Sequence, residues 1–140
     1  MLTISATLPF DNVAMMYLRL SRWSPATLSN GNVALMVNMA KYAGLPWDAI
    51  LGAEVAQAYK PQAEAYDRTA RFLDLRPEEC LMVAAHTGDL VAARGRGFRT
   101  AFVRRPLEHG PGRAPETPAP GQDLAVVADS FIDLAAKLGC

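Results

Sequence analysis

The stretch from Leu81 to Phe98 constrains the fold of this chain more than any other. The apolar residues Leu81–Ala85 form a run of the length typical of a buried strand. The next four residues, His86–Asp89, are typical of a polar turn. The alanine-rich segment Leu90–Arg94 then favours a helix that ends at Gly95 and Gly97. In an open parallel α/β sheet, ligands bind at the carboxyl ends of the strands. Asp89 therefore lies where a bound ligand is expected.

The rest of the chain alternates between strand-like and helix-like patterns. We expect strands at 25–28, 49–53, 99–103 and 124–128, and helices at 12–23, 33–42, 61–73 and 130–138. Pro61 suits the first turn of its helix. The inner face of the helix at 33–42 is expected to carry Leu35, Met36, Met39 and Ala40. The segment 105–122 holds five prolines and is expected to be a loop, while 1–10 is either a disordered lead-in or a replacement strand. Strands that alternate with helices predict one α/β domain over 1–140 with a parallel sheet.

The composition excludes several classes of protein. With 140 residues, 51% of them hydrophobic and 20% charged, the chain fits a soluble globular domain with one core. Its 14 basic and 14 acidic residues give no net charge, and so no electrostatic argument for a nucleic-acid or membrane-surface partner. No apolar run approaches the ~20 residues that span a bilayer, and no signal peptide is evident, so we expect a cytoplasmic location. Two cysteines provide neither a disulfide framework nor a metal-binding spacing.

Polar residues follow three of the expected strand ends. They are Ser29 and Asn30, then Lys60 with Tyr66 beyond it, then His86 and Asp89. Because the carboxyl ends of parallel strands meet at one edge of a sheet, we expect these side chains to gather there and to bind a small anionic substrate. Lys60 would hold a carboxylate or phosphate as a point charge, and Ser29 with the backbone N–H groups after it would hold the same anion at a helix start.

Each of these residues also has a purely structural interpretation. The alternatives are N-caps for Ser29, Asn30 and Asp89, a turn cap for His86, a core position for Tyr66 and a solvated loop position for Lys60. The functional interpretation depends on the whole set and on its order along the chain.

That order resembles the haloacid dehalogenase superfamily, and most closely its type II 2-haloacid dehalogenase branch. The matching motifs are LSNGN at Leu28–Asn32, Lys60-Pro61 with Tyr66 six residues later, and VAAHTGD at Val83–Asp89. The resemblance implies a three-layer, Rossmann-like parallel sheet. It also implies hydrolysis of the carbon–halogen bond of 2-haloalkanoic acids, in which an aspartate attacks the α-carbon, halide leaves and water cleaves the ester.

The resemblance implies a role for each polar residue. Lys60 and Ser29 would bind the substrate carboxylate, and Asp89 would orient Lys60 or the hydrolytic water; these three are the expected catalytic residues. Asn30 and Tyr66 would line the substrate or halide site. His86 stands where the branch usually has an amide, and it completes the expected substrate-binding set.

The resemblance also bears on metals. Phosphatases of the superfamily hold Mg²⁺ with two acids four residues apart, of which Asp89 matches the second. Ala85 stands at the position of the first and has no oxygen ligand to offer a hard cation. We therefore expect no metal site and no cofactor.

The expected nucleophile is absent from its usual place. The family carries it as an aspartate at the end of the first strand, in a DxxxT pattern, whereas Asp11 is the only acid before Ser29 and Met15 stands four residues after it. We interpret Asp11 as an N-cap, and the chain as the C-terminal part of a dehalogenase core, truncated, inactive alone and lacking the central strand unless 1–8 fills the gap. The alternatives are a non-catalytic anion-binding fragment and a capless hydrolase that uses Asp11; a homodimer is left open.

Overall fold

The computed structural model describes residues 2–4, 23–106, 108, 110 and 114–140. Its elements in chain order are β1 (Leu2–Ile4), β2 (Pro25–Ser29), α2 (Val33–Ala43), β3 (Ala49–Gly52), α3 (Ala53–Ala56), α4 (Ala63–Phe72), the 3-10 turn η2 (Pro77–Glu79), β4 (Leu81–Ala84), α5 (Thr87–Arg94), β5 (Arg99–Val103), β6 (Val126–Ala128) and α6 (Phe131–Lys137). Asp11 and residues 12–22 of the expected helix lie outside the described residues. The two interpretations of Asp11 therefore stay predictions.

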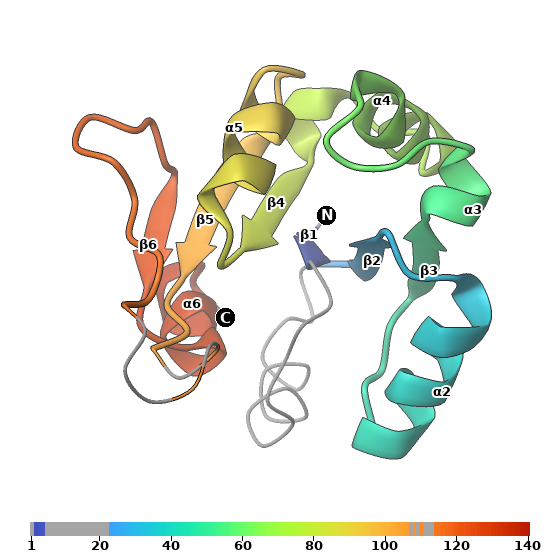
Figure 1. The fold of residues 1–140 in the computed structure, drawn as a ribbon, viewed down its shortest axis with the longest axis horizontal. Helices are drawn as coiled ribbons and strands as arrows, with labels where there is room; N and C mark the ends of the chain where they lie inside the picture. Colours follow the sequence, from blue (N-terminus) through green and yellow to red (C-terminus); the bar gives the residue numbers. More distant parts are fainter. Residues whose placement is uncertain (1, 5–22, 107, 109, 111–113) are drawn as a thin grey trace.

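The strands form one parallel sheet in the order β3-β2-β1-β4-β5-β6, which confirms the predicted α/β class. The short strand β1 occupies the centre, because Ile4 pairs with Thr27 of β2 on one side and with Val83 of β4 on the other. The central position that the motif order left open is thus held by three residues near the start of the chain (Figure 1).

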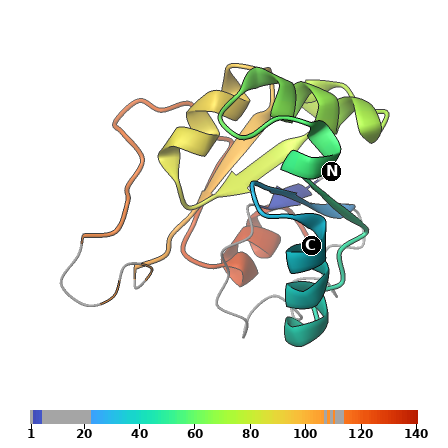
Figure 2. The ribbon, with the colours of Figure 1, turned by 45° about the vertical axis from the view of Figure 1, so that its right-hand side comes forward.

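Helices cover both faces of the sheet and complete three layers (Figure 2). Helices α3, α4 and α5 lie on one face, and α2 and α6 lie on the other. Successive side chains of a strand point to opposite faces, so β4 contributes to both layers. Leu81 and Val83 join the core under α6, while Met82 and Ala84 join the core under α4 and α5.

Helix α2 presents most of its predicted inner face to the core, with one exception. Its N-cap is Asn32, whose side chain accepts a hydrogen bond from the Leu35 N–H at 2.7 Å. Met36 is buried, whereas Leu35, one residue away on the helix, is 48% exposed. The inner-face prediction is therefore confirmed for Met36 and Ala40, which with Ala43 form an i, i+4, i+7 stripe. It is wrong for Leu35, which lies beside that stripe and is largely exposed.

Two helix boundaries near the polar residues also differ from the expectation. Helix α5 begins at Thr87 with His86 as its N-cap, so Asp89 lies in the first turn and the N-cap interpretation of Asp89 is wrong. Pro61 precedes the N-cap of α4, Gln62, and is not in the first helical turn; the Lys60–Pro61 peptide bond is cis. Among the described residues, no helix has the length and apolar character needed to span a bilayer.

Candidate active site

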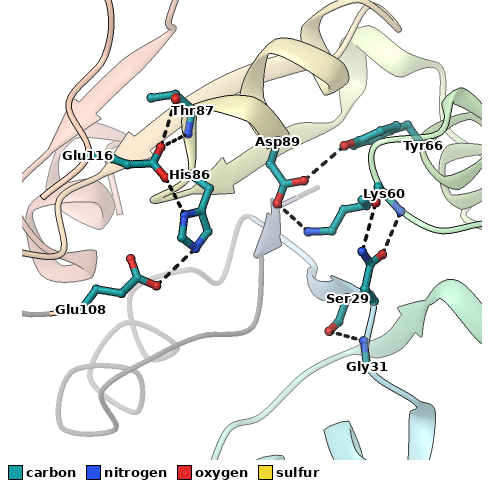
Figure 3. Close-up of polar contacts among 10 residues, drawn as sticks. Ser29, Gly31, Lys60, Tyr66, His86, Thr87, Asp89, Glu108 and Glu116 are labelled. Carbon is teal, nitrogen blue, oxygen red and sulfur yellow. Dashed lines mark hydrogen bonds and ion pairs between the residues drawn. The ribbon is translucent and has the colours of Figure 1, made fainter. Parts of the chain in front are cut away.

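Lys60 and Asp89 meet at the carboxyl edge of the sheet. Asp89 is placed there by the first turn of α5, which follows β4, and Lys60 comes from the loop between α3 and α4 (Figure 3). The Lys60 Nζ donates to Asp89 Oδ2 at 2.7 Å, and only 7% of the lysine side chain and 16% of the aspartate side chain are exposed. The helix dipole adds to the stabilisation of the Asp89 carboxylate, because negative charge is favoured in the first turn. Lys60 does lie in a loop, but the interpretation of it as a solvated residue is wrong, since its ammonium is largely buried against a carboxylate.

Tyr66 supplies the second contact to Asp89. It projects from α4, is fully buried, and packs edge-on against Phe98 with 6.1 Å between ring centroids. Its hydroxyl donates to Asp89 Oδ1 at 3.3 Å. Burial, and then the charge of Asp89, raise the pKa of Tyr66 well above its usual value, so the phenol stays protonated and remains a donor. Tyr66 is both a core residue and a partner of the site.

Asn30 contacts the backbone of Lys60 rather than a helix end. Its Oδ1 accepts from the Lys60 N–H at 2.8 Å, and its Nδ2 donates to the Lys60 carbonyl at 3.1 Å. Because Asn32 is the cap of α2, the N-cap interpretation of Asn30 is wrong.

Ser29 ends β2 and shapes the turn that follows. Its Oγ accepts a hydrogen bond from the Gly31 N–H at 3.0 Å, so it does not cap α2 either. The neighbouring strand approaches closely at this point: a Cβ on Gly52 would lie 2.3 Å from the Ser29 carbonyl oxygen. The first N–H of α2, on Val33, donates to Glu54 Oε2 at 2.7 Å. An internal carboxylate thus uses one of the N–H groups that the sequence suggested for a bound anion.

His86 interacts with two carboxylates that the sequence analysis did not single out. Its Nδ1 lies 3.0 Å from Glu116 Oε1 and its Nε2 lies 3.2 Å from Glu108 Oε1, so the ring is held between them (Figure 3). Glu116 Oε2 also accepts from the N–H and the hydroxyl of Thr87, at 2.8 and 3.0 Å. The hydrogen bond to His86, followed by that to the Thr87 N–H, lowers the pKa of Glu116. Contact between His86 and a substrate stays a prediction.

A sequence signal for these contacts exists in the proline-rich loop. Glu108 and Glu116 are the only acids in 105–122, and carboxylates favour the N-terminus of a helix such as α5. Glu108 also pairs with Arg105 at 2.8 Å, so the beginning of the loop carries its own ion pair. Within the described part of the chain, no three histidine, cysteine or acidic residues are arranged to hold a metal ion.

Comparisons with known proteins agree with the motif order. No family model matches the chain. The (S)-2-haloacid dehalogenase of Pseudomonas sp. (strain YL) is 32% identical over 82 residues, which are 57% of this chain and 35% of that protein. A crystal structure of an L-2-haloacid dehalogenase has a TM-score of 0.85 and 44% identity over 91% of this chain and 56% of its own. For a defluorinating L-2-haloacid dehalogenase the TM-score is 0.84 and the identity 43%, over 93% of this chain and 53% of its own. The chain thus spans little more than half the length of these structures, and about a third of the Pseudomonas protein.

Proposed function

Because the chain belongs to the haloacid dehalogenase-like family, we propose that its carboxyl sheet edge is the anion-binding part of a 2-haloacid hydrolase site. One observation carries this proposal. The ammonium of Lys60 is held 2.7 Å from Asp89, largely out of solvent, at the sheet edge where parallel α/β proteins bind ligands. A fixed, desolvated cation of this kind suits the carboxylate of a 2-haloalkanoate.

Each residue of the site has its own proposed role in binding the substrate. Lys60 attracts the substrate carboxylate, and the hydroxyl of Ser29 donates its own proton to it while its oxygen accepts from the Gly31 N–H. Asp89 orients the ammonium of Lys60. Tyr66 fixes the other oxygen of Asp89, because its protonated hydroxyl donates there.

The step that breaks the carbon–halogen bond needs a carboxylate positioned in line with the leaving halide. Asp89 is engaged by both Lys60 and Tyr66, which does not suit an attacking group. Asp11 is the only acid before Ser29 in the sequence. We therefore propose that these 140 residues bind a 2-haloalkanoate but do not release halide from it.

The test measures binding and turnover separately on the purified chain. Calorimetric titration with (S)-2-chloropropanoate is expected to show saturable binding that is lost in Lys60→Met, while halide release stays at the rate of the uncatalysed reaction. Arg71→Met serves as the matched control. Arg71 is also a cation, but it lies in the last turn of α4, where its guanidinium stacks on the Phe72 ring.

Three results would count against the proposal. Absence of binding, or binding that survives Lys60→Met, would contradict the anion site. Halide release that is lost in Asp11→Asn would favour the capless hydrolase that uses Asp11. Halide release that survives Asp11→Asn would mean that another residue attacks the substrate.

A further inference from the structure

The side chain of Asn30 forms hydrogen bonds with both the N–H and the carbonyl of one residue that is far away in the sequence. Asn30 follows β2, and Lys60 lies 30 residues later in the loop before α4. The amide oxygen accepts from the Lys60 N–H at 2.8 Å, and the amide nitrogen donates to the Lys60 carbonyl at 3.1 Å. A primary amide that pairs with N–H and C=O of the same residue acts like a strand edge and fixes both the place and the rotation of that residue.

We propose that Asn30 is a positioning residue that aims the ammonium of Lys60 at Asp89. This inference rests on the function proposed above for Lys60. Lysine carries a long, flexible stem, and its ammonium is a compact point charge, so its direction depends on where the backbone is held. With its N–H and carbonyl both turned toward Asn30, Lys60 sends its side chain to Asp89, where Nζ meets Oδ2 at 2.7 Å.

The support behind Asn30 is itself rigid. Ser29 accepts the N–H of Gly31 at 3.0 Å, which closes the turn around Asn30. Gly52 packs so closely on the Ser29 carbonyl that a Cβ there would lie 2.3 Å away. The turn is therefore held from both sides, and the hydrogen bonds of Asn30 transmit its position to the Lys60 loop.

Two hydrogen bonds between Tyr59 and Gln62 also restrain the loop that carries Lys60. The N–H of Gln62 donates to the Tyr59 carbonyl at 2.8 Å, and the Gln62 side chain accepts from the Tyr59 N–H at 3.1 Å. These bonds close the loop on itself, but they do not tie it to the sheet. Asn30 supplies the connection between this closed loop and the end of β2.

The experiment compares Asn30→Ala with Asn32→Ala. The two asparagines lie two residues apart in the chain, but the side chain of Asn32 caps α2, where it accepts from the Leu35 N–H at 2.7 Å. The first readout is the ¹H–¹⁵N NMR signal of the Lys60 ammonium, identified by its loss in Lys60→Met. We expect Asn30→Ala to broaden or shift this signal and Asn32→Ala to leave it in place. An unchanged signal in Asn30→Ala overturns the inference whether or not any ligand binds.

The second readout is the affinity for (S)-2-chloropropanoate. Asn30→Ala is expected to weaken binding about tenfold, which is within the coupling seen for residues of one hydrogen-bond network. Asn32→Ala is expected to change the affinity less than twofold. A displaced ammonium without loss of affinity overturns the positioning role in binding.

Failure of the proposed function has a separate signature. If the unaltered chain does not bind (S)-2-chloropropanoate, the proposed function fails, while the ammonium signal still decides whether Asn30 positions Lys60. Asn30→Ser is the second variant, should Asn30→Ala fold poorly. Its single hydroxyl cannot reach both backbone groups of Lys60, so the same displacement is expected.

Discussion

The ion pair between Lys60 and Asp89 predicts a large energetic coupling between the two residues. Their charged atoms lie 2.7 Å apart, with 7% and 16% of the side chains exposed. The pair between Arg96 and Asp67 offers a matched comparison on the same layer of helices. It is bidentate, with both distances at 2.8 Å, but the two side chains are 43% and 41% exposed.

The expected magnitudes follow from this difference in burial. Removing one partner of a buried ion pair typically costs about 3–5 kcal/mol, because the other charge stays desolvated. Lys60→Met should cost less, about 2–3 kcal/mol, since Asp89 keeps the hydrogen bond from Tyr66 and some solvent. Asp89→Asn should cost a similar amount, and the double variant little more than either single one. The coupling is then about 2 kcal/mol. The coupling of the exposed pair should be clearly smaller, because solvent screens its charges.

Urea unfolding at pH 7 measures both couplings, from the four proteins of each double-mutant cycle. The slope of the unfolding free energy against urea must stay constant across a cycle for the comparison to hold. A coupling between Lys60 and Asp89 no larger than that between Arg96 and Asp67 would refute the reasoning. It would mean that burial does not strengthen the interaction between the two charges.

Two further predictions concern the surroundings of the site. Gly52→Ala should lower the unfolding free energy by about 1–3 kcal/mol, since its Cβ would lie 2.3 Å from the Ser29 carbonyl oxygen. Gly88→Ala, with no atom within 4 Å of its Cβ, is the control and should be neutral or stabilising. Equal stabilities of the two variants in urea unfolding would contradict this. Glu116→Gln should cost under about 1 kcal/mol at pH 7, because Glu116 is partly exposed. Its lowered pKa means that the stabilisation is complete above the unfolded-state pKa and is lost as pH falls through the folded-state pKa, so the two proteins should converge in urea unfolding at acid pH, below that folded-state pKa. A pH-independent difference would count against the bonds to His86.

Local patterns were sufficient to predict most strands and the α/β class. The strand β4 is an apolar run followed by a polar turn, and β2 and β5 are also short, mostly buried runs. The central strand β1 is different, because Leu2–Ile4 is too short to carry a periodic pattern. Its place depends on pairing with residues more than twenty positions away on one side and nearly eighty on the other. Such non-local pairing is decided by the rest of the sheet and not by the three residues themselves.

The helix caps show a second limit of local reasoning. Several residues with cap-forming side chains stand together before α2 and before α5, and each could satisfy the first N–H groups of a helix. Asn32 caps α2 with its side chain, whereas His86 occupies the N-cap position of α5 without a side-chain cap bond and Glu116 accepts the Thr87 N–H instead. Asp89 and Asn30 are thereby released from capping, and they meet Lys60 instead.

The contacts of Glu108 and Glu116 depend on a long loop, and sequence spacing alone does not determine how such a loop folds back. Both carboxylates lie against His86, more than twenty residues away in the sequence. The charge of the α5 N-terminus and the two acids of the loop were visible in the sequence, but their meeting requires the tertiary structure.

The topology also relates the proposed binding residues to the expected position of a nucleophile. Ile4, the last residue of β1, pairs with Thr27 and Val83, which lie two residues before Ser29 and six before Asp89. The end of the central strand is therefore flanked by the two segments that carry the proposed anion site. A carboxylate held there would face an anion bound between them, whereas Ser29 and Asp89 belong to the flanking segments and Lys60 to the loop before α4. The sequence after Ile4 has no acid before Asp11. Binding without halide release is the outcome that this arrangement favours, because the residues for holding the substrate and the residue for attacking it are contributed by different strands.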